Sequence, residues 1–163
     1  MADYMLITQG TQPFAQRLGR QLAAGRQVLF GAADGLPEVL LRSGNYVRLP
    51  HVDTSAFTHE MLKVCLDHGV THLVPLGISE LRPLLEAKIL FGEYGVSVLL
   101  PDSRVFDELT HFENPPAQLP LVVLEDGKPI DQLEPEEIAD ASLSGVYVRS
   151  DSGDTFALCC LSD

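Results

Sequence analysis

The sequence has no apolar run that approaches the roughly 20 residues needed to span a bilayer. It is also poor in cations: 11 Lys and Arg stand against 23 Asp and Glu, which gives a formal net charge of −12. A charge of this sign and size repels phosphate backbones and anionic lipid surfaces. We therefore expect neither nucleic acid nor a membrane as a partner.

Cysteine is scarce as well. The three cysteines are odd in number and two of them, Cys159 and Cys160, are adjacent, so they do not form a disulfide framework. The first ten residues, MADYMLITQG, lack a basic leader and a long apolar core, and they favour a first strand over a signal peptide. Together these features predict a reducing, cytoplasmic location.

Low-complexity segments and internal repeats are absent too. A hydrophobic content of 45% with 21% charged residues is typical of a folded globule. A chain of 163 residues can bury one real core but is short for two full domains. We therefore expect one domain with a C-terminal appendage.

Residues 71–102 have the pattern strand, helix, strand. Two near-continuous apolar runs, at 73–76 and 96–100, are typical of parallel strands covered on both faces. Between them an apolar stripe at spacings of three and four predicts one helix, capped by Ser79 and ended by Gly95. The residues of this stripe are Leu81, Leu84, Leu85 and Ile89.

The same alternation continues toward the N-terminus. Short apolar runs predict strands at 4–8, 27–33 and 45–49, and helical stripes lie at 13–24, 36–41 and after residue 55. Alternating strands and helices are the mark of a doubly wound α/β fold. The sequence thus predicts a Rossmann-like, mainly parallel sheet with a β-rich C-terminal extension.

The extension begins where Asn114-Pro115-Pro116 breaks the chain. We predict a Rossmann-like domain over residues 1–113 and a β-rich extension over 114–163, with a turn at Gly127 and a hairpin through residues 151–154. The apolar hairpin arms need cover, either from the α/β layer or from a second subunit. Because an open strand edge invites pairing with its own copy, we expect a homodimer.

One segment carries a resemblance to a known family. Residues 65–75 read CLDHGVTHLVP, Glu80-Leu81 follow, and VSVLLPD closes the segment at residue 102. With this segment, residues 4–102 resemble the pre-ATP-grasp domain (biotin carboxylase N-terminal-like) of the ATP-grasp superfamily.

The resemblance implies a site in which a strand end and a helix start lie beside the substrate. It also implies that the ATP-grasp catalytic portion, with its phosphate-binding lysines and magnesium-binding acids, is absent from this chain. On this basis we expect a non-catalytic binding or assembly module that assists a separately encoded ATP-grasp enzyme or binds a small-molecule ligand.

The alternative is a nucleotide- or dinucleotide-binding enzyme or sensor that uses the loops at Gly10 and Gly77. Gly10 to Ala15 occupies the place of a glycine-rich phosphate loop, and Asp34 follows the second strand where a ribose ligand would lie. Pro13 fits this fingerprint poorly because it removes an N–H donor.

Metal and nucleophile signals are weak. Cys65, His68 and His72 have spacings that suit zinc, but Cys65 belongs to an apolar stripe and His72 lies beyond the turn at Gly69. The sequence has no Gly-x-Ser-x-Gly elbow. We expect no metal, no cofactor and no catalytic residue.

Ligands of α/β sheets bind outside the carboxyl ends of the strands. For Glu80 the competing interpretation is a first-turn carboxylate that stabilises a helix dipole. The residues predicted to line a ligand crevice are Thr8, Gln9, Gly10, Thr11, Asp34, Pro75, Gly77 and Glu80.

Overall fold

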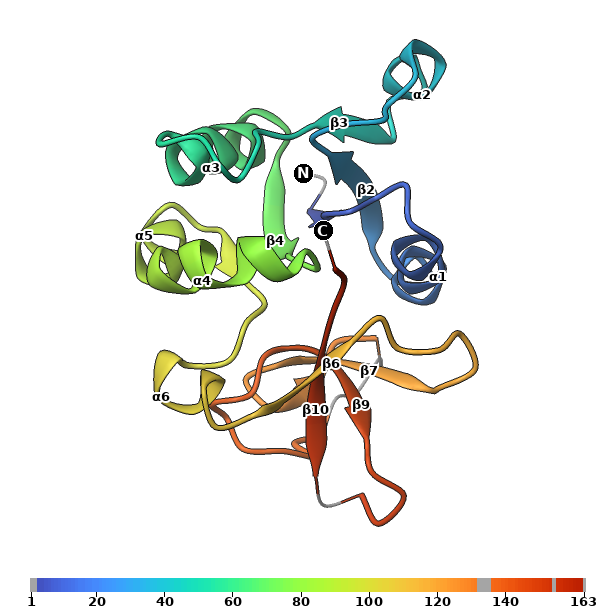
Figure 1. Ribbon diagram of the computed structural model, residues 1–163, viewed down its shortest axis with the longest axis vertical. Helices are drawn as coiled ribbons and strands as arrows, with labels where there is room; N and C mark the ends of the chain where they lie inside the picture. The colour runs from blue at the N-terminus through green and yellow to red at the C-terminus, as the bar shows by residue number, and fades with distance from the viewer. Residues whose placement is uncertain (1–2, 132–135, 154, 163) are drawn as a thin grey trace.

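The computed structural model describes residues 3–131, 136–153 and 155–162. They form a five-stranded, all-parallel sheet flanked by helices and a second five-stranded, mixed sheet (Figure 1). The predicted α/β class, a Rossmann-like sheet with a β-rich extension, is confirmed. The strands of the parallel sheet are β1 (Tyr4–Ile7), β2 (Gln27–Ala32), β3 (Tyr46–Arg48), β4 (Val70–Val74) and β5 (Ser97–Val98), in the order β3-β2-β1-β4-β5.

Five helices lie between the strands of this sheet in the chain: α1 (Pro13–Leu22), α2 (Glu38–Arg42), α3 (Phe57–Asp67), α4 (Ile78–Glu86) and α5 (Lys88–Glu93). All but α2 bury residues. Figure 1 shows α1 and α2 on one side of the sheet and α3, α4 and α5 on the other. The chain changes side because it leaves β1 toward β2 and β3 and then returns to place β4 on the other flank of β1. Such a reversal opens a crevice at the carboxyl ends of β1 and β4. None of the helices described is both long and apolar enough to cross a membrane.

Apolar residues explain why these elements form. Met5, Leu6 and Ile7 of β1 are all fully buried, as expected for a central strand covered on both faces. The stripe of α1 packs on this sheet, and Gly19 lets the helix approach Phe30 of β2 closely. A Cβ on Gly19 would clash with Cζ of the Phe30 ring.

The prediction of a single helix after β4, capped by Ser79, is wrong in two respects. Its N-cap is Gly77 and not Ser79, and it stops at Glu86, because Ala87 leaves the helical conformation before α5 begins. This break turns Ile89, the predicted end of the buried stripe, to solvent with 81% of its surface exposed, and Phe91 is buried in its place. Gly95 has a φ of 82° and follows the end of α5, as predicted.

The second sheet follows α6 (Ser103–Phe106). Its order is β6-β10-β9-β7-β8, with β6 parallel to β10 and the other pairs antiparallel. A turn with positive φ at Asp126 and Gly127 joins β7 to β8, and the predicted hairpin joins β9 to β10; residue 154 of that hairpin lies outside the described residues. The strands are β6 (Thr110–Glu113), β7 (Leu121–Glu125), β8 (Lys128–Pro129), β9 (Gly145–Arg149) and β10 (Phe156–Cys160).

The β-rich unit therefore takes in β6, which precedes the predicted boundary at residue 114. A proline-based boundary signal cannot place this strand, because its membership depends on pairing with β10 almost 50 residues later in the chain.

The hairpin of β9 and β10 packs on the α/β layer of the same chain. Val146 and Cys159 share a buried cluster with Ile7 of β1 and Leu18 of α1, and Tyr147 lies in a second cluster with residues of α3 and α4. The apolar surface that motivated the dimer prediction is thus covered within one chain. The homodimer stays a prediction, without this support.

The end of β10 reaches the loop between β4 and α4. The Leu161 amide donates to the Leu76 carbonyl at 2.7 Å, and the Ile78 amide donates to the Leu161 carbonyl at 2.8 Å. The Asn114 side chain binds Ser162, the residue after Leu161. Its Nδ2 donates to the Ser162 hydroxyl at 2.9 Å, and its Oδ1 accepts from the Ser162 amide at 3.1 Å. The second sheet therefore fixes the backbone at the start of α4.

Candidate functional site

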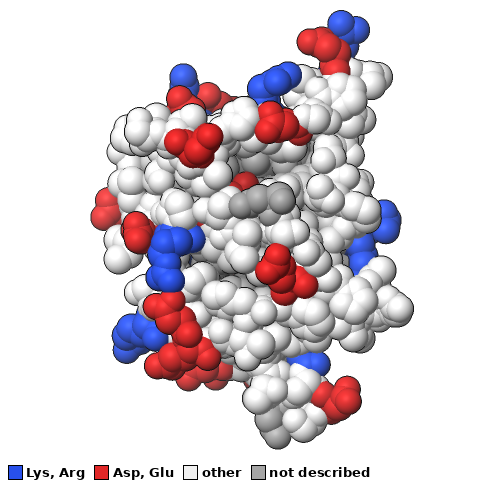
Figure 2. All heavy atoms as spheres, in the orientation of Figure 1, with Lys and Arg blue, Asp and Glu red and all other residues white. Residues whose placement is uncertain are grey.

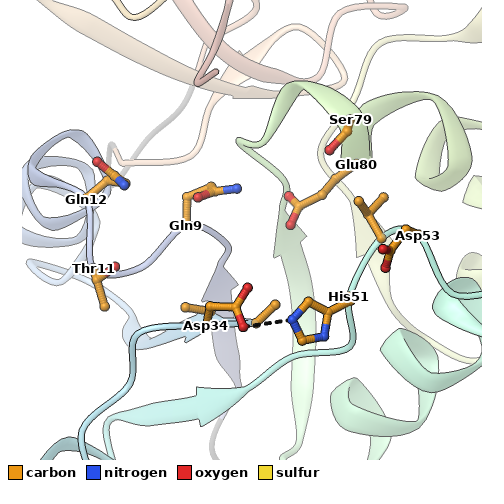
Figure 3. Close-up of a pocket in the computed structure, with 11 residues that line it drawn as sticks. Gln9, Thr11, Gln12, Asp34, His51, Asp53, Ser79 and Glu80 are labelled. Carbon is orange, nitrogen blue, oxygen red and sulfur yellow. Dashed lines mark hydrogen bonds and ion pairs between the residues drawn. The ribbon is translucent and has the colours of Figure 1, made fainter. Parts of the chain in front are cut away.

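A cavity of about 420 Å³ lies at the carboxyl edge of the parallel sheet. Its walls come from the segments that follow β1, β2, β3 and β4, which end side by side beneath it (Figure 3). The lining residues are Gln9, Thr11, Gln12, Ala32, Ala33, Asp34, His51, Val52, Asp53, Ser79 and Glu80. The crevice expected from the strand order is therefore present, and most of its side chains are polar.

Glu80 is fixed by a residue distant in sequence, Thr8, and by the N-cap residue of its own helix, Gly77. Its Oε2 accepts a hydrogen bond from the Thr8 hydroxyl at 2.6 Å and one from the Gly77 amide at 3.1 Å. The Thr8 hydroxyl oxygen in turn accepts from the Leu76 amide at 2.8 Å. Glu80 is 9% exposed, so its carboxylate is held in one wall of the cavity.

Gln9 lies opposite this carboxylate. Its backbone has a φ of 53°, a left-handed conformation that is uncommon outside glycine. Figure 3 shows the side chains of Gln9 and Glu80 directed toward one another from the loop after β1 and from α4. Gly77 lies behind both, since a Cβ there would come within 2.6 Å of the Gln9 Nε2 and 3.1 Å of the Glu80 Oε2. A side chain at position 77 would thus disturb both groups.

Asp34 and His51 form the opposite rim. The Asp34 Oδ1 and His51 Nε2 are 2.8 Å apart, and they join the segment after β2 to the segment after β3. Their side chains are 82% and 53% exposed, so the pair adds little stability. The pair holds one imidazole ring and one carboxylate at the mouth of the cavity, beside Asp53 (Figure 3).

Two helix N-termini border the cavity, and the chain itself occupies several of the backbone donors beside them. At α1, the Gly10 amide donates to the Gly31 carbonyl at 2.8 Å, the Gln12 amide donates to the Gln9 carbonyl at 3.0 Å, and Pro13 has no N–H. Three positions at and before the start of α1 therefore offer no free backbone donor to a phosphate.

At α4 the situation is the same. The Gly77 amide donates to the Glu80 carboxylate and the Ile78 amide to the Leu161 carbonyl. Among the described residues that line the cavity, Asp34, Asp53 and Glu80 carry carboxylates and none is Lys or Arg. One face of the molecule accordingly shows acidic groups in and beside a hollow (Figure 2). The cavity accepts hydrogen bonds more readily than it binds anions.

The eight predicted crevice residues divide into two groups. Gln9, Thr11, Asp34 and Glu80 line the cavity. Thr8, Gly10, Pro75 and Gly77 are buried and do not line it, and of these Thr8 and Gly77 donate hydrogen bonds to Glu80.

The polar residues that sequence reasoning missed are Gln12, His51, Asp53 and Ser79. A usable signal existed for His51 and Asp53, because both follow the predicted third strand and so belong to the same carboxyl edge. No comparable signal marked Gln12, which is the N-cap residue of α1.

The three cysteines and His72 do not line the cavity. Burial raises the pKa of the Cys65 thiol to about 12, and it raises the pKa of the Cys159 thiol to about 12 as well. Both thiols are therefore poor nucleophiles. His72 contacts Glu125 of β7, with 3.2 Å between Nε2 and Oε1, and does not share a site with Cys65. Within the described ranges, no three His, Cys, Asp or Glu side chains are grouped so that they could hold a metal ion.

A scan against protein-family models gave no match for this chain, and a search of curated proteins gave none either. The interpretation of the cavity therefore depends on its own geometry.

Proposed function

We propose that this chain is a non-catalytic binding module that holds a small-molecule ligand in the cavity bounded by Gln9, Asp34, His51 and Glu80. The observation that supports this is the convergence of four strand ends on one polar cavity at the reversal of the strand order. Its volume, about 420 Å³, lies within the range of small-molecule sites.

In this proposed function the chain does not itself catalyse phosphoryl transfer. Such chemistry needs a metal and cationic groups around the transferred phosphate. The described lining of the cavity offers neither Lys nor Arg. We therefore expect no hydrolysis of ATP by the isolated chain in the presence of magnesium.

The resemblance of residues 4–102 to a pre-ATP-grasp domain supports a narrower form of this function. In it, the chain supplies the substrate-side surface for a separately encoded ATP-grasp enzyme. An ATP-grasp protein that lacks its own first domain and is encoded beside this chain would be the partner to test by co-purification.

A nucleotide-binding enzyme or sensor is the second candidate. Asp34 favours it, because this carboxylate follows β2 and lies in the cavity where a ribose hydroxyl would be bound. The occupied amides of Gly10 and Gly77 disfavour it, because a pyrophosphate would have to displace bonds within the chain.

Thermal unfolding of the full chain with a ligand panel tests the proposal. The panel contains ATP with magnesium, NAD, NADP, carboxylates, amines and sugars. A ligand at 100 times its dissociation constant stabilises the chain by about 2.7 kcal/mol, which raises the midpoint measurably.

Ala33→Leu places a larger side chain in the cavity wall, and Ala24→Leu is its matched control. A ligand that binds in the cavity should lose its effect in Ala33→Leu and keep it in Ala24→Leu, at an exposed position beyond α1. Stabilisation that is equal in the two variants would place the ligand elsewhere and contradict the proposal.

A further inference from the structure

The hydrogen-bonding groups of the cavity define which ligand it suits. The Glu80 carboxylate is held in place by the Thr8 hydroxyl and the Gly77 amide, so it needs no rearrangement to accept from a ligand. Gln9 faces it, and Asp53 lies at the rim (Figure 3). A ligand that donates several hydrogen bonds would therefore find acceptors already oriented.

The charge of the cavity lining also favours a ligand that donates hydrogen bonds and carries positive charge. Three carboxylates and no Lys or Arg are found among the described lining residues, on a chain with a formal net charge of −12. A cleft lined by one sign of charge concentrates ligands of the opposite sign. The amides of Gly10 and Gly77, in the loops before α1 and α4, are already bonded within the chain.

A bare metal ion does not fit these observations. The described residues contain no group of three potential ligands close enough to surround an ion. Acceptors spread around a cavity of about 420 Å³ instead suit a cation that brings its own size and its own N–H donors.

We infer that the cavity takes a small organic cation, a metabolite with a primary amine or guanidinium group directed at Glu80 and a second donor within reach of Asp53. This inference rests on the proposed binding function and names its ligand class. The ammonium or guanidinium group donates to the Glu80 carboxylate, which makes a charge-assisted hydrogen bond.

The test is an NMR titration of the isotope-labelled full chain that follows the backbone amides of Gln9, Ala33 and Ser79. Four-carbon compounds of similar length and different charge are compared: putrescine, 1,4-butanediol and succinate. Agmatine, L-lysine, L-arginine and glucosamine widen the amine set, and ATP and adenosine represent nucleotides. The expected result is a saturable shift of the three amides with at least one amine, and none with butanediol or succinate.

Two variants with the same change of charge locate the effect. Asp53→Asn removes a carboxylate from the cavity rim, whereas Asp67→Asn removes an exposed one at the end of α3, away from the cavity. Amine affinity should fall about tenfold in the first variant, as for loss of a charge-assisted hydrogen bond, and stay unchanged in the second. An equal fall in both would show diffuse attraction to an acidic protein and overturn the inference.

The remaining outcomes separate the inference from the proposed function. If succinate, butanediol, adenosine or ATP shifts the cavity amides at least as strongly as the amines do, the ligand class is wrong and the binding function stands. If no compound of any charge shifts them at millimolar concentration, the inference and the proposed function both fail.

Discussion

Thr8 and Glu80 lie 72 positions apart in the sequence, and a buried hydrogen bond of 2.6 Å joins their side chains. The same hydroxyl oxygen accepts from the Leu76 amide. One threonine at the end of β1 thus fixes both the backbone after β4 and the carboxylate that enters the cavity.

Thr8→Val should lower the free energy of unfolding by about 1–3 kcal/mol, because it removes one buried donor to the Glu80 carboxylate and the side-chain acceptor of the Leu76 amide. Thr8→Ser keeps the hydroxyl and is the matched control. Urea unfolding of both variants gives the comparison. Equal stability of Thr8→Val and Thr8→Ser would contradict the role assigned to the hydroxyl.

Leu85→Ala and Ile89→Ala test where the buried stripe ends. Leu85 is 5% exposed and Ile89 is 81% exposed. The first change should cost about 2–5 kcal/mol of unfolding free energy and the second less than about 0.5 kcal/mol. Denaturant unfolding measures both. A large loss in Ile89→Ala would show that the stripe continues through Ala87 as one helix.

Glu125 links the two sheets and should make stability depend on pH. Its hydrogen bond with His72, opposed by burial and aided by Ser97, lowers its pKa from 4.5 to about 2. Because the pKa is lower in the folded state, the ionised group adds stability above about pH 4.5, and this contribution is lost as the pH falls toward 2.

Glu125→Gln should therefore be less stable than the parent chain at neutral pH, and the difference should shrink between about pH 4.5 and 2. Urea midpoints measured across that range test this. The exposed Glu108→Gln provides the control and should show a smaller difference at every pH. A gap for Glu125→Gln that is constant with pH would contradict the role of the charge.

Asn114 should control how firmly the second sheet holds the start of α4. Its side chain bonds Ser162 twice, next to Leu161, which bonds Leu76 and Ile78. Asn114→Gly keeps the positive φ of 51° accessible and removes only the side-chain bonds. We expect faster hydrogen exchange at the Leu161 and Ile78 amides, with unchanged exchange at the β1 amides.

Exchange that increases equally at β1 would mean a general loss of stability rather than a local release. The control Ser162→Ala removes the hydroxyl partner and keeps the bond from its own amide to Asn114. It should therefore have a smaller effect than Asn114→Gly.

Local pattern determined much of the parallel sheet. Buried strands such as β1 and β4 are short apolar runs, and α1 is an amphipathic stripe that starts at Pro13, so each was readable from neighbouring residues. Once strands and helices alternate, the rule for carboxyl ends is enough to place Gln9, Asp34 and Glu80 at one edge.

Only the tertiary structure decided the rest, because it depends on contacts between distant segments. The helix break at Ala87, the pairing of β6 with β10 and the bonds of Leu161 to the α4 start each require packing that no local window contains. Glu80 likewise becomes a fixed acceptor only because Thr8 donates to it. His51 reaches the same cavity only because β3 pairs with β2. The periodicity of apolar residues specifies which face of a helix or strand is apolar. Which other element packs on that face depends on long-range contacts that form only when the whole chain folds.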